Sequence, residues 1–135
     1  MAHVKRFEDL KIWQIARELC NKVYALINSG KCGKDFDLIL QTRRSSGTCM
    51  DCIAEGFGRG GNREFVQFLS IVTGSANEVK SQLYRSLDQK YITKADKTAE
   101  KLYNKTGAFI RYLLRSDIKG EKFGAYDKTV AGKKG

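Results

Sequence analysis

Lysine and arginine side chains recur between residues 93 and 115 at the spacing of one helical face. On a helical wheel they fall within about 120°, opposite the apolar residues of the same segment. The set is Lys94, Lys97, Lys101, Lys105, Arg111 and Arg115. A row of cations about 30 Å long matches a tract of nucleic-acid backbone phosphates. A solvated outer face of a helix explains the same pattern equally well.

Three further arginines are candidate phosphate contacts: the pair Arg43 and Arg44, and Arg59 inside a glycine cluster at 56–61. The cluster formally contains G-x-G-x-x-G, but a dinucleotide site needs a β-strand before the first glycine. Here a helical pattern precedes it, which excludes that reading. The cluster does lie before a predicted helix start, where free backbone N–H groups attract anions. A plain interhelical turn is the alternative.

No set of side chains predicts catalysis, and we expect no cofactor and no metal. Cys49 and Cys52 form a C-x-x-C, but the motif lies late in a predicted helix, whereas redox chemistry uses it at a helix start. We therefore expect reduced packing cysteines, with a metal or redox role as the alternative. Glu55 has no evident catalytic partner and is expected to bond backbone N–H groups or a nearby arginine. The chain is not expected to be an enzyme.

Composition indicates one domain with a strong excess of positive charge. The chain has 135 residues, a net charge of +10 and a pI near 9.6, which indicate either a polyanion partner or simple solubility. No segment is long and apolar enough to span a bilayer, and the start of the chain does not resemble a signal peptide. Four cysteines in such a chain are expected to stay reduced, so we predict a cytoplasmic protein.

Hydrophobic periodicity predicts helices over 8–28, 35–55, 62–89 and 93–115. Glycines at 56–61 are expected to stop the second helix, and Asn62 to cap the third. Thr93 should begin the fourth helix, with Asp96 completing a capping box. Residues 1–115 then form the bundle domain, and 116–135 form a basic, glycine-containing, flexible C-terminal tail.

The helix faces predict how the elements pack. The first helix has an apolar arc of about 200°, so it is either central in its own bundle or partly covered by another subunit. In the second helix, Ser45-Ser46-Gly47 indicates either close approach of a neighbouring helix or local weakness. Its predicted inner face is Phe36, Ile39, Leu40, Met50, Ile53 and Ala54. The third helix carries a stripe from Phe65 to Leu87. The fourth is expected to turn Tyr103 inward with its apolar set.

Three segments in order carry a resemblance to a known family: Phe7-Glu8-Asp9-Leu10-Lys11-Ile12-Trp13, Gln41-Thr42-Arg43-Arg44 and the run from Ile53 to Phe65. Over residues 7–115 the chain resembles the 23S rRNA-intervening-sequence proteins, also called the four-helix bundle protein family. The resemblance implies an all-α, antiparallel four-helix bundle that assembles into a ring-like homopentamer. The family is also distantly similar to accessory proteins of diversity-generating retroelements, which are basic pentameric bundles.

The function we expect from these observations is a non-enzymatic, oligomeric protein associated with nucleic acid. It would contact RNA or DNA phosphates through its basic surface, without strong sequence readout. The alternative is a structural or scaffolding oligomer that binds a protein partner. Steep loss of RNA binding with salt separates the first from the second.

Overall fold

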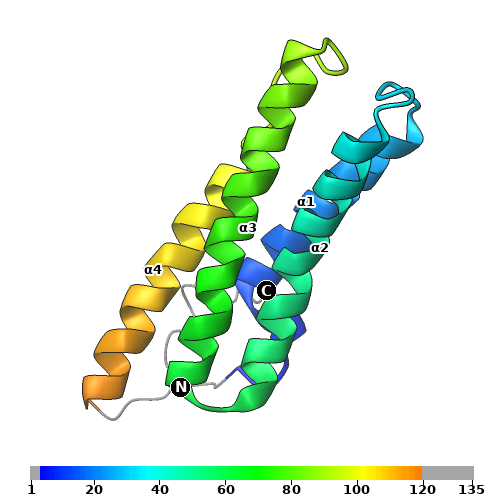
Figure 1. The fold of residues 1–135 in the computed structure, drawn as a ribbon. Helices are drawn as coiled ribbons and strands as arrows, with labels where there is room; N and C mark the ends of the chain where they lie inside the picture. Colours follow the sequence, from blue (N-terminus) through cyan, green and yellow to red (C-terminus); the bar gives the residue numbers. More distant parts are fainter. Residues whose placement is uncertain (1–3, 120–135) are drawn as a thin grey trace.

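The computed structural model describes residues 4–119, which fold into helices with no β-strand in that range (Figure 1). A short 3₁₀ helix, η1, precedes four α-helices. The bounds are η1 Phe7–Asp9, α1 Lys11–Asn28, α2 Phe36–Arg59, α3 Asn62–Asp88 and α4 Thr98–Lys119. None of the described helices combines the length and the apolar character needed to cross a lipid bilayer.

Each long helix packs against two others. α2 contacts α1 and α3, and α4 contacts α3 and α1, so the four helices surround one core. The α1–α2 loop and the α3–α4 connection lie at the same end of the molecule, and the α2–α3 loop lies at the other end (Figure 1). A hydrogen bond joins the first two connections, because the Tyr91 hydroxyl donates to Asp35 Oδ2 at 3.0 Å.

The predicted stripe on the third helix is confirmed as the centre of the core. Phe65, Leu69, Val72, Ala76 and Val79 are completely buried. Aromatic contact extends the core into α4, because the rings of Phe65 and Phe109 meet edge-on with centroids 5.5 Å apart. Edge-to-face geometry suits the ring quadrupoles and adds to the area that the two rings bury.

The broad apolar arc of α1 is covered mainly within its own bundle. Ile12, Ile15, Ala16, Leu19 and Val23 are buried in the core formed with the other helices. Only Tyr24 of the predicted arc is exposed as a large side chain. Thus, most of the arc's width is explained by a central position in the subunit.

The glycine cluster does not stop α2 where the sequence predicted. α2 continues through Gly56 and Gly58 to Arg59, and the left-handed residue that ends it is Gly60, with φ of 83°. Gly61, in an extended conformation, precedes α3 as its N-cap, so the prediction for Asn62 was wrong. A Cβ atom built on Gly56 would lie 2.7 Å from Phe68 Cβ. Close packing of α2 on α3, rather than termination of the helix, therefore requires this glycine.

The buried face of α2 is more polar than predicted. Phe36 and Leu40, assigned to the inner face, are 70% and 42% exposed. Small and hydroxyl-bearing residues are buried in α2 instead, among them Thr42, Ser45 and Ser46. They suit this position because neighbouring helices approach closely. The Ser45 hydroxyl accepts a hydrogen bond from Gln82 Nε2 of α3 at 3.2 Å. The Cys20 thiol of α1 donates to the Ser46 carbonyl at 3.0 Å. Close approach, not local weakness, explains the small residues.

Both ends of the fourth helix differ from the prediction. α4 begins at Thr98 rather than Thr93, because Asp96 Oδ1 accepts the Thr98 backbone N–H at 2.7 Å and caps the helix there. The helix continues past residue 115 to Lys119. The remainder of the predicted C-terminal tail, 120–135, lies outside the described residues.

Candidate nucleic-acid interface

The outward face of α4 carries exposed cations. Buried Leu102, Phe109 and Leu113 hold the opposite face of the helix in the core. The exposed basic residues on the helix are Lys101, Lys105, Arg111 and Arg115. Within the described part of the chain, the ammonium groups of Lys101 and Lys105 make no ion pair. Their charges are therefore available to an external anion.

The structure divides the predicted basic stripe into two parts. Since α4 begins at Thr98, both Lys94 and Lys97 lie in the connection that precedes it. Lys97 is exposed beside the first turn of α4, where it contributes, after Lys80, to lowering the pKa of the Glu100 carboxyl. Lys94 lies farther back along the connection and lines a hollow at the end of the bundle. The continuous 30 Å row expected from the sequence is therefore not formed by one helix.

The hollow at this end contains two lysines that the sequence reasoning missed. We call it the lysine hollow; its volume is about 480 Å³, and its lining residues are Lys31, Lys90, Tyr91, Ile92, Thr93 and Lys94. Lys31 comes from the α1–α2 loop and Lys90 from the start of the α3–α4 connection. Lys90 adopts a left-handed conformation with φ of 66°, which turns the chain out of α3. The order of the helices could have predicted this grouping, because in a bundle of alternating helices the first and third loops lie at the same end.

The other arginine candidates are dispersed, and two of them are already engaged. Arg59 pairs with Glu55 at 2.8 Å and lies over the Phe68 ring, 5.3 Å from its centroid. This confirms an arginine partner for the Glu55 carboxylate. Arg43 lies over the Tyr24 ring at 6.0 Å. Arg44 lines a shallow groove between α2 and α3. None of the three joins α4 in one surface cluster.

Acidic partners neutralise other lysines near α4. Lys80 on α3 pairs with Glu100 at 3.0 Å. Lys22 on α1 pairs with Asp96 at 2.9 Å and also donates to Thr98 Oγ1 at 2.8 Å. Burial alone would raise the pKa of Asp96, but hydrogen bonds from Thr98 and Lys22 outweigh it and lower the pKa to about 2. These pairs connect α4 to its neighbours.

One exposed aromatic flanks the basic face. Tyr103, which the sequence assigned to the inner face, is 41% exposed. It lines a hollow of about 490 Å³ together with Gly107, Ile110 and Arg111. An exposed ring beside an arginine is the combination on which single-stranded bases stack. Tyr112 is half-buried and stacks on Phe109, so it offers less surface to a ligand.

The cysteines have the properties of packing residues. Burial, followed by the nearby Cys20 and Cys52 thiols, raises the pKa of Cys49 to about 12. Burial also raises the pKa of Cys52, with smaller contributions from Glu55 and Asp51. A raised pKa keeps a thiol protonated and poorly nucleophilic. Across residues 4–119, no group of three or more His, Cys, Asp or Glu side chains is arranged to hold a metal ion.

In a comparison with protein families, the model for the 23S rRNA-intervening sequence protein family matches residues 8–114 of this chain. The match covers α1, α2 and α3 completely and most of α4. Neither the curated proteins nor the solved structures contain a significant match.

Proposed function

We propose that this chain, which belongs to the 23S rRNA-intervening sequence protein family, is a non-enzymatic, oligomeric protein that contacts RNA or DNA phosphates through a basic surface. The surface we propose has two parts, the outward face of α4 and the lysine hollow. It would bind the backbone of many sequences with similar affinity, because phosphate contacts carry no sequence information.

The observation that carries this proposal is the difference between two groups of lysines. Lys22 and Lys80 are held by carboxylates of the same subunit. Lys101 and Lys105 on the outward face of α4 have no such partner among the described residues. Solubility alone does not require lysines without a carboxylate partner, because paired charges also keep a surface hydrated. Exposed Tyr103 beside Arg111 adds a surface on which a base can stack.

We further propose that the subunit is an antiparallel four-helix bundle and that it assembles into a ring-like homopentamer in the cytoplasm. Contacts of Gly56 with Phe68 and of Gln41 with Arg85, at opposite ends of the α2–α3 pair, support the antiparallel arrangement. The number of subunits rests on the family resemblance alone. Light scattering at micromolar concentration tests it: a monomer refutes assembly, and another oligomer refutes only the number.

A salt titration of nucleic-acid binding tests the proposed function. Fluorescence anisotropy with a labelled single-stranded RNA and a DNA of the same sequence should give a linear fall of log affinity with log salt. Each phosphate contact contributes a slope of about 0.7 on a single strand. Absence of binding at 50 mM salt would refute the proposal. Comparable affinity for unrelated sequences is expected, and strong preference for one sequence would contradict recognition through phosphates.

A specific observation supports the alternative, a scaffolding oligomer with a protein partner. Tyr103, Gly107, Ile110 and Leu114 follow one another along α4 at helical spacing, and Leu114 is 49% exposed. Tyr103 and Leu114 are exposed and Ile110 between them is partly buried, and an exposed apolar strip of this kind is typical of a protein contact. Crosslinking in cells, followed by identification of the molecules that co-purify, separates the two. Protein without RNA or DNA favours the alternative.

A further inference from the structure

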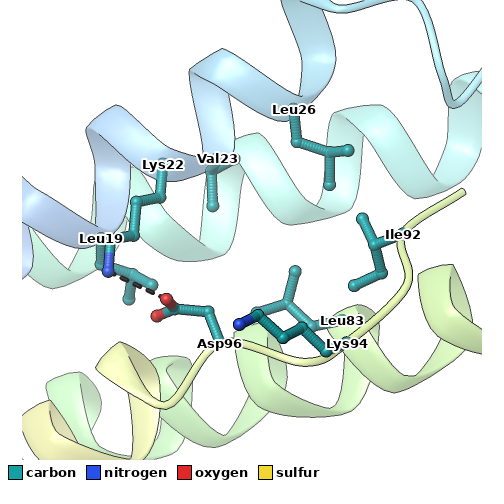
Figure 2. Close-up of a pocket in the computed structure, with 8 residues that line it drawn as sticks. All are labelled: Leu19, Lys22, Val23, Leu26, Leu83, Ile92, Lys94 and Asp96. Carbon is teal, nitrogen blue, oxygen red and sulfur yellow. Dashed lines mark hydrogen bonds and ion pairs between the residues drawn. The ribbon is translucent and has the colours of Figure 1, made fainter.

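A small apolar pocket lies between α1, the end of α3 and the connection that leads to α4. Its volume is about 110 Å³. Figure 2 shows side chains from α1 pointing toward side chains from α3 and the connection, with the polar groups gathered at one side. The apolar lining residues are Leu19, Val23, Leu26, Leu83 and Ile92. Among residues 4–119, no aromatic ring or hydroxyl lines the pocket, so it suits a saturated or aryl group without polar atoms.

Three charged side chains complete the pocket, and two of them already form an ion pair with each other. Lys22 and Asp96 are bonded to each other at 2.9 Å, as the dashed line in Figure 2 shows. Asp96 also accepts the Thr98 N–H, and Lys22 also pairs with Glu18 at 3.2 Å. Lys94 has no ion pair or hydrogen bond from its side chain within residues 4–119. The charge that remains for a ligand at this pocket is therefore positive.

The surroundings reinforce this preference for an anion. Ile92 and Lys94 line both the apolar pocket and the lysine hollow, so the two cavities adjoin at this segment. Lys31 and Lys90, which line the hollow, add two further cations near the same place. A cationic ligand would have to displace Lys22 from Asp96 and would also meet these lysines. A neutral ligand would gain no ionic contact with Lys94, whose exposed ammonium would remain in water.

The size of the pocket limits the apolar part of the ligand. An engineered dry cavity of about 150 Å³ in another protein takes one benzene molecule. A pocket of about 110 Å³ therefore encloses less than one benzene molecule. A chain of about four to six carbons or a single ring enters it and remains partly outside. The head of the ligand must stay at the polar side, where Lys94 lies (Figure 2).

From this combination we propose that the pocket binds a small organic carboxylate, with a short acyl chain or one ring among the apolar side chains and the carboxylate on Lys94. The pocket shares Lys94 and Ile92 with the lysine hollow. The proposal does not rest on the nucleic-acid function, however, and the test below contains no nucleic acid. A carboxylate and an ammonium form a charge-assisted hydrogen bond. The apolar tail supplies the rest of the affinity, which for so few atoms lies in about the millimolar range.

Chemical-shift titration of the full chain tests the site with sodium hexanoate as the probe. We expect saturable shifts of the methyl signals of Leu19, Val23 and Ile92. Acetate has the head without the tail, and hexylammonium has the tail with the opposite charge. Both should bind at least about tenfold more weakly than hexanoate, because each loses one of the two contacts. Equal binding of hexylammonium and hexanoate, or no saturation by hexanoate, would overturn the proposal.

Two variants and a control locate the ligand. Lys94→Gln should weaken hexanoate binding about fivefold or more while leaving the pocket open. Lys90→Gln removes a cation from the adjoining hollow but not from the pocket, so it should change the affinity less than twofold. Ile92→Phe fills the pocket and should abolish the methyl shifts. If Ile92→Phe does not fold, the test rests on Lys94→Gln. The Lys94 side chain is exposed, so this substitution should leave the fold intact. Unchanged affinity in Lys94→Gln refutes the assignment of the head group.

Discussion

Replacement of Gly56 and Gly58 by alanine should change stability in opposite directions. Both glycines lie inside α2, two positions apart, and neither has a positive φ. Helix propensity favours alanine over glycine by about 0.5–1 kcal/mol at either position. Propensity alone therefore predicts that both substitutions stabilise the protein.

Contacts across the α2–α3 interface reverse the sign at Gly56. A Cβ atom there would lie 2.7 Å from Phe68 Cβ and 2.9 Å from Phe65 Cδ1. The Phe68 Cβ atom is fixed to the backbone of α3, so it moves only if the helices separate. Such overpacking costs about 1–3 kcal/mol. Because two contacts are too short, we expect a cost near the upper end and a net destabilisation of about 2 kcal/mol for Gly56→Ala.

Gly58 is the matched control, since a Cβ atom there meets nothing within 4 Å. Gly58→Ala should stabilise the chain by about 0.5 kcal/mol, because the site lies near the end of the helix. Thermal and urea unfolding at one fixed protein concentration measure both variants. For a chain of this size, 1 kcal/mol corresponds to about 4 °C in Tm. If Gly56→Ala is as stable as Gly58→Ala, close packing does not explain the buried glycine.

Three further perturbations follow from individual contacts. Asp96 has a pKa of about 2 against an ordinary 3.8, so its carboxylate stabilises the fold above about pH 4 and loses this effect as the pH falls toward 2. The pKa difference sets an upper limit of about 2.5 kcal/mol on this stabilisation, and solvent screening of the half-exposed side chain reduces it to about 1 kcal/mol. Asp96→Asn should therefore cost about 1 kcal/mol at pH 7 and almost nothing at pH 2. The same loss at both pH values in urea titrations would contradict the ion pair. Cys49 should resist a thiol reagent in the native protein at pH 8 while Cys52 reacts first, and replacing both with alanine should leave the protein folded. Rapid labelling of Cys49, detected by mass spectrometry, would contradict its burial. Phe36→Ser should change the free energy of unfolding by less than about 0.5 kcal/mol, because the ring is 70% exposed; a loss above about 2 kcal/mol would show that another surface covers it.

Periodicity in the sequence was sufficient to predict the helices whose apolar residues recur without interruption. The third helix was placed correctly because Phe65, Leu69, Val72 and Ala76 keep a spacing of three and four. The prediction of buried positions failed where small residues, rather than apolar ones, face a neighbouring helix. Ser45 and Gly56 are buried by close helix approach, and no hydrophobic pattern marks such a position.

The start of α4 and the surface near it could not be predicted by local rules. By local rules a helix could start at either Thr93 or Thr98. In the structure it starts at Thr98, where Asp96 also contacts Lys22 on α1. That shift removes Lys94 from the helical wheel and places it beside Lys31 and Lys90. Cations from two loops meet there only because of the fold, so a stripe counted along one segment could not include them.

Charge reversal on α4 tests the central proposal, that this face contacts nucleic-acid phosphates. Lys101, Lys105 and Arg115 are exposed on one helix and point away from the core, so their change to glutamate should leave helicity and Tm nearly unaltered. A control with the same change in net charge reverses three exposed cations elsewhere, namely Lys5, Arg17 and Lys34.

The measurement is RNA affinity against salt for the parent, the α4 variant and the control. We predict that the α4 variant loses at least about tenfold in affinity at 150 mM salt relative to the control. Its slope of log affinity against log salt should fall by about 0.7 for each lost contact with a single strand. Several copies in an oligomer would enlarge the loss. If the α4 variant and the control bind RNA equally, with the same slope, the face of α4 is only a solvated surface and the claim that this face contacts nucleic acid is wrong.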